Sequence, residues 1–253
     1  MTNPFGTLNM AAGYASSRPP VHPRVIEKVN QQLRRTEPFD FALDVGCGGG
    51  VSTAALDGFA RRVVGLEPME SMLKFAPKTA PFAAFLAGTA EAIPMGDCSV
   101  DVVTAAGSLN YVDLERFFPE ALRVLKTSGV LVVYDFSPGR SFRDAPGLDE
   151  WFSEFFKRYP PPRNQARALS PAILAESATG FRLCEHEEFE IGIVLTPAFY
   201  LDYILTETNV ADAVRNGMPY GEIRAWCSET LTPVFNRRER EVLFPGYFAC
   251  LRR

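Results

Sequence analysis

Closely spaced cysteine pairs, an excess of positive charge and long apolar runs are all missing from this sequence. Its five cysteines show no CxxC or CxxH spacing, so neither a zinc site nor a disulfide framework is indicated, and a reducing compartment is favoured. The formal net charge of -4 disfavours a nucleic acid backbone or an anionic membrane surface as the main partner. No apolar run approaches the length of a membrane span, and residues 1–10 lack the charged-then-apolar order of a signal peptide. We therefore expect a cytoplasmic protein that acts on a small molecule without a metal; the sequence does not indicate its oligomeric state.

The composition is that of an ordinary globular protein, with 47% hydrophobic and 22% charged residues among 253. A chain of this length suits one large α/β domain. Apolar strand patterns alternate with helical ones, which predicts a Rossmann-like, doubly wound and mostly parallel seven-stranded sheet with helices on both faces. Strands are expected at 41–45, 62–66, 82–87, 100–106, 130–136, 181–195 and 246–251, and helices at 25–33, 52–59, 69–76, 114–125, 172–178, 199–205 and 222–234.

Residues 137–169 interrupt this alternation with several prolines and glycines and one aromatic segment at 151–156. The segment is too long for a plain connection, so we predict a lid or substrate insert within a single domain that spans residues 1–253. Aromatic side chains here and later in the chain are candidates for an apolar pocket, and for each a core role is an equally good interpretation. They are Trp151, Phe152, Phe155, Phe156, Tyr200, Tyr203 and Trp226.

A glycine-rich turn follows the first expected strand, at residues 44–50. Such a turn lets backbone N–H groups approach a ligand closely, and both a phosphate and an adenosyl group can use it. The dinucleotide spacing G-x-G-x-x-G counted from Gly46 requires a glycine where Val51 stands, which disfavours NAD. No lysine follows the turn, so a Walker-type nucleotide site is not indicated either.

Glu67 ends the second expected strand, where a carboxylate can accept both hydroxyl hydrogens of a ribose. A glycine turn alone is often a structural loop. A glycine turn followed by an acid at the end of the next strand favours a ribose-containing ligand instead.

The chain resembles the class I S-adenosylmethionine-dependent methyltransferases through four segments in the family's order. The branch it is most similar to includes ubiquinone-biosynthesis and trans-aconitate-type enzymes. The matching segments are Leu43–Gly50, Gly65–Glu67, Gly88–Met95 with Asp97, Ser99, Asp101 and Val102 after it, and Phe118–Lys126 with Gly129.

This resemblance implies S-adenosyl-L-methionine as cofactor and a set of residues that bind it. Tyr14 and Arg18 would close over the methionine carboxylate, for which a phenol and a guanidinium are suited; a solvent-exposed pair is the alternative. Thr89 stands where many relatives carry an aspartate toward the adenine, so that contact is assigned to the next two residues. The implied cofactor residues are Tyr14, Arg18, Asp44, Gly46, Cys47, Gly48, Glu67, Pro68, Met69, Ala90, Glu91 and Ser108.

Asn110 and Tyr111 occupy the place where relatives often carry a His-Trp pair beside the transferring methyl group. They keep a hydrogen-bonding group and an aromatic ring but lack an imidazole, so we assign them a positioning role. The residues around His22 and His186 in the sequence do not indicate that either histidine is a catalytic base.

We expect in-line methyl transfer to O, N or C of a small molecule, relying mainly on positioning of the acceptor. A cofactor-binding protein with a regulatory or non-transferring role is the alternative, and an NAD-dependent oxidoreductase is a weaker one.

Overall fold

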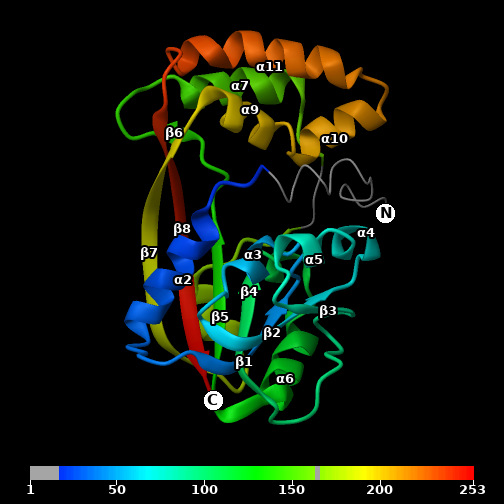
Figure 1. Cartoon of the computed structure of the whole chain (residues 1–253), viewed down its shortest axis with the longest axis vertical. Coiled ribbons are helices and arrows are strands. Elements are labelled where there is room, and N and C mark those ends of the chain that lie inside the picture. Colours follow the sequence, from blue (N-terminus) through cyan, green and yellow to red (C-terminus); the bar gives the residue numbers. More distant parts are fainter. Residues whose placement is uncertain (1–16, 163–165) are drawn as a thin grey trace. The chain divides into compact units, whose positions relative to one another are not determined.

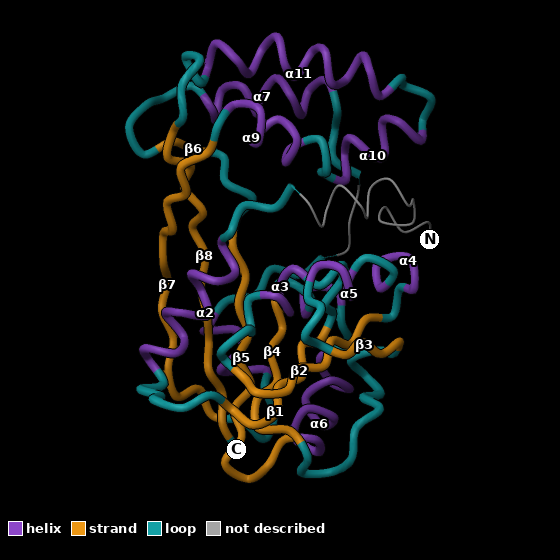
Figure 2. Tube along the Cα trace, in the orientation of Figure 1, coloured by secondary structure: helices purple, strands orange, loops and turns teal. Residues whose placement is uncertain are grey.

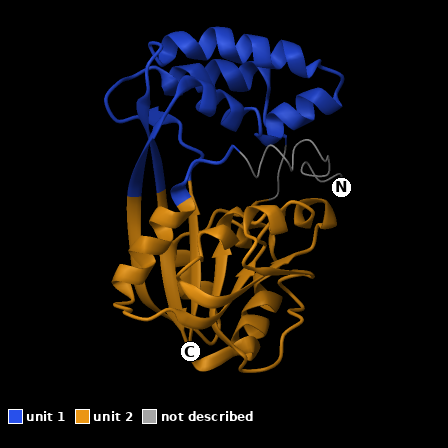
Figure 3. Cartoon of the chain, in the orientation of Figure 1, with its two compact units in different colours: residues 1–21, 137–164, 190–245 blue, residues 22–136, 165–189, 246–253 orange. Residues whose placement is uncertain are grey.

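The computed structural model describes residues 17–162 and 166–253 (Figures 1 and 2). The chain forms two compact units, coloured separately in Figure 3. The first unit comprises residues 1–21, 137–164 and 190–245, and the second comprises 22–136, 165–189 and 246–253. The predicted insert is therefore divided between the two, and both the one-domain organisation and the lid role stay predictions.

A mixed sheet of eight strands runs through the described residues, in the order β3-β2-β1-β4-β5-β8-β6 with β7 paired to β8. The five strands from β3 to β5 pair in parallel, while β8 pairs with β5 and with β6 in the antiparallel sense. The predicted doubly wound, Rossmann-like fold is thus confirmed; the additional strand is the two-residue β6. The bounds are β1 Phe39–Val45, β2 Ala60–Glu67, β3 Ala84–Ala87, β4 Val100–Ala106, β5 Leu125–Phe136, β6 Ser141–Phe142, β7 Arg182–Leu195 and β8 Arg240–Arg252.

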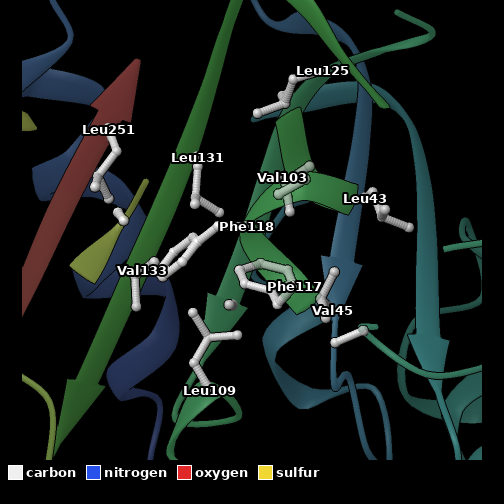
Figure 4. Packing of buried hydrophobic residues seen from close by; sticks show 14 of the residues in the cluster. Leu43, Val45, Val103, Leu109, Phe117, Phe118, Leu125, Leu131, Val133 and Leu251 are labelled. Atoms are coloured by element: carbon white, nitrogen blue, oxygen red, sulfur yellow. The ribbon is translucent and has the colours of Figure 1, made fainter. Parts of the chain in front are cut away.

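Helix α6 (Leu114–Val124) covers one face of the sheet in the second unit. Its Phe117 and Phe118 are fully buried against alternate residues of β1, β4 and β5, among them Leu43, Val103 and Leu131 (Figure 4). Burying a phenylalanine contributes roughly 1.5–3 kcal/mol, so this helix fixes the layer beneath the candidate site. Leu174 of α8 (Pro171–Ser177) joins the same cluster.

The opposite face of the sheet presents the residues that alternate with these. Tyr134 of β5 lies on this face, and the Nδ1 atom of His22 in α2 (Val21–Gln32) is 2.9 Å from its hydroxyl. Three further short helices belong to the second unit: α3 (Val51–Ala54), α4 (Glu70–Leu73) and α5 (Ala76–Thr79).

The first unit has a core of stacked aromatic rings contributed by α7 (Leu148–Arg158) and α11 (Tyr220–Val234). The Trp151 ring stacks on Phe155 at a centroid distance of 4.9 Å, and the Trp151 indole N–H donates to the Thr230 hydroxyl at 2.8 Å. Of the seven aromatics named above as pocket candidates, Trp151, Phe152, Phe155, Tyr200 and Tyr203 are buried and form this core and its extension into α9 (Pro197–Ile204). The core interpretation holds for those five.

Several element limits differ from the sequence expectation. α6 ends at Val124 because Leu125 adopts extended backbone, and β5 begins there and runs through Gly129; the prediction that the strand begins at residue 130 was wrong. A register shift between Val100 and Val102 accommodates the early start. α10 (Thr208–Arg215) was not expected, and the helix predicted at 52–59 is confined to α3.

Among the residues that the structure describes, no helix is both long and apolar enough to cross a bilayer. The same residues bring together no group of three His, Cys, Asp or Glu side chains that could hold a metal ion.

Candidate cofactor site

The parallel strand order reverses between β1 and β4, which lie side by side at the centre of the sheet. In open α/β sheets, ligands bind at such a switch point, outside the carboxyl ends of the strands. The glycine turn leaves β1 at this point, and Gly107 and Ser108 leave β4 there.

Gly46 and Ser108 touch across the switch point. Gly46 has a φ of +71°, and a Cβ atom placed on it would lie 2.3 Å from the Cβ of Ser108. The Ser108 hydroxyl donates to the Val45 carbonyl at 2.7 Å, and the Gly46 N–H donates to the Leu66 carbonyl at 2.7 Å. The absence of a side chain at residue 46 therefore allows the two loops to meet.

The Glu67 carboxylate joins the glycine turn to the start of α4. Its Oε2 accepts a hydrogen bond from the Gly48 N–H at 3.1 Å, and its Oε1 accepts one from the Met69 N–H at 3.0 Å. Burial raises the pKa of Glu67, and these two N–H donors act in the opposite direction. Each oxygen keeps a lone pair, so the carboxylate can still accept the two hydroxyl hydrogens of a ribose.

Asp44 lies beneath the turn and supports it. Its Oδ2 accepts from the Ser52 and Thr53 hydroxyls at 2.7 Å each, and its Oδ1 accepts from the Thr104 hydroxyl at 2.9 Å. Burial raises its pKa, and the three hydroxyls act against the rise. These bonds show Asp44 as a buried support for the turn, and its direct contact with a ligand stays a prediction.

Cys47 points inward as well. Its thiol is buried and stands 2.7 Å from where a Cβ of Gly65 would be. Burial raises the pKa of this thiol, with the nearby charges of Asp44 and Glu67 adding to the effect. The side chain of Cys47 therefore faces the protein interior, and only its backbone is available to a ligand at the turn.

The loop after β3 carries the residues predicted to meet the adenine, and α6 holds it. Glu120 accepts from the Ile93 N–H at 2.8 Å, while Arg123 donates to the Met95 carbonyl at 2.7 Å and the Ile93 carbonyl at 2.8 Å. Ala90 is buried in the core, and the Glu91 carboxylate accepts from the Asp113 N–H at 3.0 Å.

The start of α4 brings the remaining predicted residues beside Glu67. Pro68 is exposed, and Met69 is half-buried at the cap position of α4. Met72 also lies near the glycine turn, and its methyl group is 3.4 Å from where a Cβ of Gly48 would be. Sequence reasoning missed Met72, although it lies on the same short helix.

Asn110 has a partner that sequence reasoning also missed. Its Nδ2 donates to the Asp135 Oδ2 at 2.7 Å, and the Phe136 N–H donates to the Asp135 Oδ1 at 2.8 Å. Burial raises the pKa of Asp135, against these two donors. An acid near the carboxyl end of an apolar strand was the available signal. Tyr111, by contrast, is 68% exposed.

Comparison with known proteins matches residues 43–133 to a family model described as a methyltransferase domain. Residues 43–133 of this chain are thus similar to a methyltransferase domain. This confirms the resemblance given by the four sequence segments.

Two curated relatives and one solved structure illustrate what the methyltransferase domain is similar to. An uncharacterized methyltransferase of Mycobacterium tuberculosis is 34% identical over 131 residues, covering 52% of this chain and 51% of the relative. A ubiquinone/menaquinone biosynthesis C-methyltransferase of Methylobacterium nodulans is 37% identical over 136 residues, covering 50% and 52%. The chain thus spans about half the length of these relatives. The structure of a putative type II methyltransferase from Anaeromyxobacter dehalogenans is 22% identical with a TM-score of 0.67, covers 90% of this chain and 94% of that one, and shows the shared fold.

Two predicted cofactor residues lie outside the methyltransferase domain. Tyr14 is outside the described residues. Arg18 belongs to the first unit, where its guanidinium carbon lies 5.2 Å from the centroid of the Tyr203 ring. Their contact with the methionine carboxylate stays a prediction.

The two histidines differ in setting. His22 is half-buried, with its ring edge-on to Tyr134 and Phe136. His186 is exposed on β7. Neither is among the residues of the glycine turn, and the residues that His22 contacts, Tyr134 and Phe136, are the neighbours of Asp135 in β5.

Proposed function

We propose that the chain transfers a methyl group from S-adenosyl-L-methionine to a small-molecule acceptor, at O, N or C. One observation carries the proposal: the Glu67 carboxylate is held beside the glycine turn by the Gly48 and Met69 N–H groups, at the switch point of the sheet. The matched methyltransferase domain and the curated relatives support the same reaction.

The residues present fit an adenosyl cofactor. Glu67 would accept the ribose hydroxyls, the loop held by Glu120 and Arg123 would face the adenine, and the turn at Gly46 to Gly48 would pass close to the methionine end. When bound, the sulfonium supplies an electrophilic methyl group with a good leaving group, so the protein need only align the acceptor.

Asn110 and Asp135 would provide that alignment at the carboxyl end of β5. The Asn110 amide holds one Asp135 oxygen, and the remaining lone pairs of this carboxylate can accept a hydrogen bond from an acceptor hydroxyl or amine. We therefore give Asn110 a positioning role and Tyr111 a place on the exposed rim.

Calorimetry with S-adenosylhomocysteine tests the cofactor site. We expect Glu67→Gln to weaken binding by about tenfold or more, because a hydrogen bond to a charged group contributes about 1.5–3 kcal/mol. Gly48→Ala should also weaken binding, since Gly48 has a φ of +53° and its added methyl would contact Met72.

Gly58→Ala is the matched control, because Gly58 also has a positive φ, of +73°, but has no atom within 4 Å of an added Cβ. Both alanines should cost about 1–2 kcal/mol of stability through backbone strain, and only the change at residue 48 should lower affinity. Equal binding by wild type, Glu67→Gln and Gly48→Ala would refute the site.

Methyl transfer itself is tested by incubating the protein and methyl-labelled cofactor with a small-molecule extract. We expect label in at least one metabolite, and loss of that label with Glu67→Gln. Tight cofactor binding with no labelled product would favour the regulatory, non-transferring role.

A further inference from the structure

Asp135 lies near the carboxyl end of β5, in the same compact unit as the glycine turn. The Gly107 N–H donates to the Tyr134 carbonyl at 2.8 Å, which holds the loop after β4 against this end of β5. A Cβ atom on Gly107 would lie 3.0 Å from the Asp135 Oδ1. Ser108, the next residue, contacts Gly46 of the glycine turn. The Asp135 carboxylate is therefore beside the loop that reaches the predicted cofactor site.

One side of the Asp135 carboxylate is left open by a glycine. A Cβ atom on Gly107 would stand over the carboxylate, because it would also lie 3.6 Å from Cγ and 4.0 Å from Oδ2. Asp135 and Asn110 are both half-buried, and Tyr111 beside them is 68% exposed. A ligand can therefore approach the carboxylate from the side of Gly107.

The hydrogen bonds that Asp135 accepts come from neutral donors, the Asn110 amide and the Phe136 N–H. A carboxylate accepts about four hydrogen bonds, so each oxygen keeps a lone pair. In the part of the chain that the structure describes, no lysine or arginine pairs with Asp135. A partly buried anion without a cation beside it favours a ligand that carries positive charge.

An aromatic ring adds to this preference. Tyr247 of β8 is directly opposite Asp135 in the antiparallel pairing with β5, and side chains of opposed residues lie on the same face of a sheet. Burial raises the pKa of Tyr247, and the charge of Asp135 adds to the rise. A carboxylate beside an aromatic ring is a setting that favours an ammonium group over a neutral hydroxyl.

The other two acids of the candidate site already have roles. Asp44 accepts from three hydroxyls beneath the glycine turn. Glu67 is held at the turn by two backbone N–H groups and is assigned to the ribose. Asp135 is the acid of this site that remains for the acceptor.

We propose that Asp135 binds the protonated amine of the acceptor and removes one of its protons, so that the methyl group is transferred to nitrogen. This inference deepens the proposed function and rests on it. The proton moves from the ammonium to a carboxylate oxygen, which leaves a neutral amine and a neutral acid. The nitrogen lone pair then forms the new bond to the methyl carbon while the carbon–sulfur bond breaks and its electron pair stays on sulfur. The product is a methylated ammonium, and Asp135 releases its proton to water.

Burial explains why an amine suits this site better than a hydroxyl. Proton transfer from an ammonium to a carboxylate removes two opposite charges, and a site of low polarity favours the neutral pair. Transfer from a hydroxyl would only move the negative charge to a stronger base. Burial also raises the pKa of Asp135, against the two hydrogen bonds it accepts, and this brings the acid closer to an amine in proton affinity.

The first experiment measures binding to the full chain by calorimetry at pH 7, with the protein saturated with S-adenosylhomocysteine. Benzylamine and benzyl alcohol are the probes, because they differ only in the ammonium and the hydroxyl. We expect the amine to bind more tightly than the alcohol, and Asp135→Asn to weaken the amine by about tenfold or more. This variant keeps the shape of the side chain. Asp57→Asn, at an exposed position of the same unit, is the matched control.

The second experiment identifies the atom that is methylated. The protein and methyl-labelled cofactor are incubated with a small-molecule extract, before and after the extract is treated with N-hydroxysuccinimidyl acetate, which acylates amines. We expect a product with its label on nitrogen, and no such product from the treated extract. Asp135→Asn should slow labelling at pH 7 by about a hundredfold or more. The rate of this variant should recover as the pH approaches the pKa of the amine itself, and a purely structural role would leave the pH profile unchanged.

The groups around Asp135 allow this pH profile to be interpreted. Burial raises the pKa values of Tyr134 and Tyr247, and the charge of Asp135 adds to both rises, so both phenols stay neutral near pH 7. Arg167 is exposed, and its N–H donates to the carbonyl of residue 110; its guanidinium is charged throughout. His22 contacts the opposite face of β5, and His22→Asn controls for its own titration.

Circular dichroism checks that each variant is folded. Label on oxygen or carbon, label that persists after acylation, or equal affinity of wild type and Asp135→Asn for benzylamine would overturn the inference and leave the proposed function standing. If no extract is labelled and S-adenosylhomocysteine does not bind, the proposed function fails. Benzylamine binding that depends on Asp135 would then still support the amine site, and its absence would overturn both.

Discussion

The contact between Gly46 and Ser108 decides whether the loops after β1 and β4 can meet. Gly46→Ala would place a Cβ 2.3 Å from the Ser108 Cβ in addition to straining a φ of +71°. We expect it to cost more than the roughly 1–2 kcal/mol of strain alone. Adding Ser108→Gly removes the atom that clashes, so the double variant should recover part of the loss. Urea unfolding of the four proteins in a double-mutant cycle measures this coupling, and strictly additive effects would contradict it.

Asp135 links protonation to stability. Burial raises the pKa of Asp135 in the folded state above its ordinary 3.8. The stability that the protonated side chain contributes is therefore fully present below pH 3.8, and it is lost as the pH rises through the raised pKa. Asp135→Asn removes this loss, and Asn110 can turn its amide to keep the hydrogen bond. The variant should therefore gain stability over wild type as pH rises from about 3.5 to 7. Denaturant unfolding at both pH values checks this, with the exposed Asp57→Asn as control; a constant difference would contradict it.

At the scale of elements, α6 carries the loop between β3 and β4. Arg123 and Glu120 hold residues 93 and 95 through charge-assisted bonds. Arg123→Met should make this loop more mobile. We expect faster amide hydrogen exchange at residues 88–97 and several-fold weaker binding of S-adenosylhomocysteine. Arg116→Met, at an exposed position of the same helix, should do neither. Unchanged exchange in the first variant would show that the core alone positions the loop.

Elements with local signals were predictable from sequence, and long-range pairings were not. Gly46 directly follows an apolar strand and Glu67 ends one, and Ser170, which precedes a proline, caps α8 by accepting from the Ile173 N–H. The hydrogen bond between Asn110 and Asp135 and the ion pair between Arg140 and Glu207 form only when the chain folds, and no local sequence pattern predicts them. The early start of β5 was not predicted, because the extended backbone at Leu125 depends on pairing with Val100.

On the scale of the whole molecule, both tryptophans of the chain, Trp151 and Trp226, belong to the first unit. Fluorescence therefore reports the first unit, while far-ultraviolet circular dichroism reports both. β7 and β8 contribute residues to each unit, so we expect the two thermal transitions to coincide. Separate transitions would show that the units unfold independently.

Phe155→Ala extends this test, because it removes a fully buried ring from the first unit. The cost should be about 3–5 kcal/mol, and both signals should move to lower temperature together. Phe82→Ala, on a ring that is 46% exposed in the second unit, should move neither by much. A lower transition temperature in the fluorescence signal alone would contradict coupled unfolding of the two units.

The hydrogen bonds between α6 and the loop between β3 and β4 also have a consequence for protein engineering. The helix that anchors Ile93 and Met95 is the same one that inserts Phe117 and Phe118 into the core. The loop and the helix must therefore be exchanged together. A chimera that exchanges residues 88–97 with a relative must take residues 114–124 from the same parent, or the grafted loop will lack the side chains that hold it.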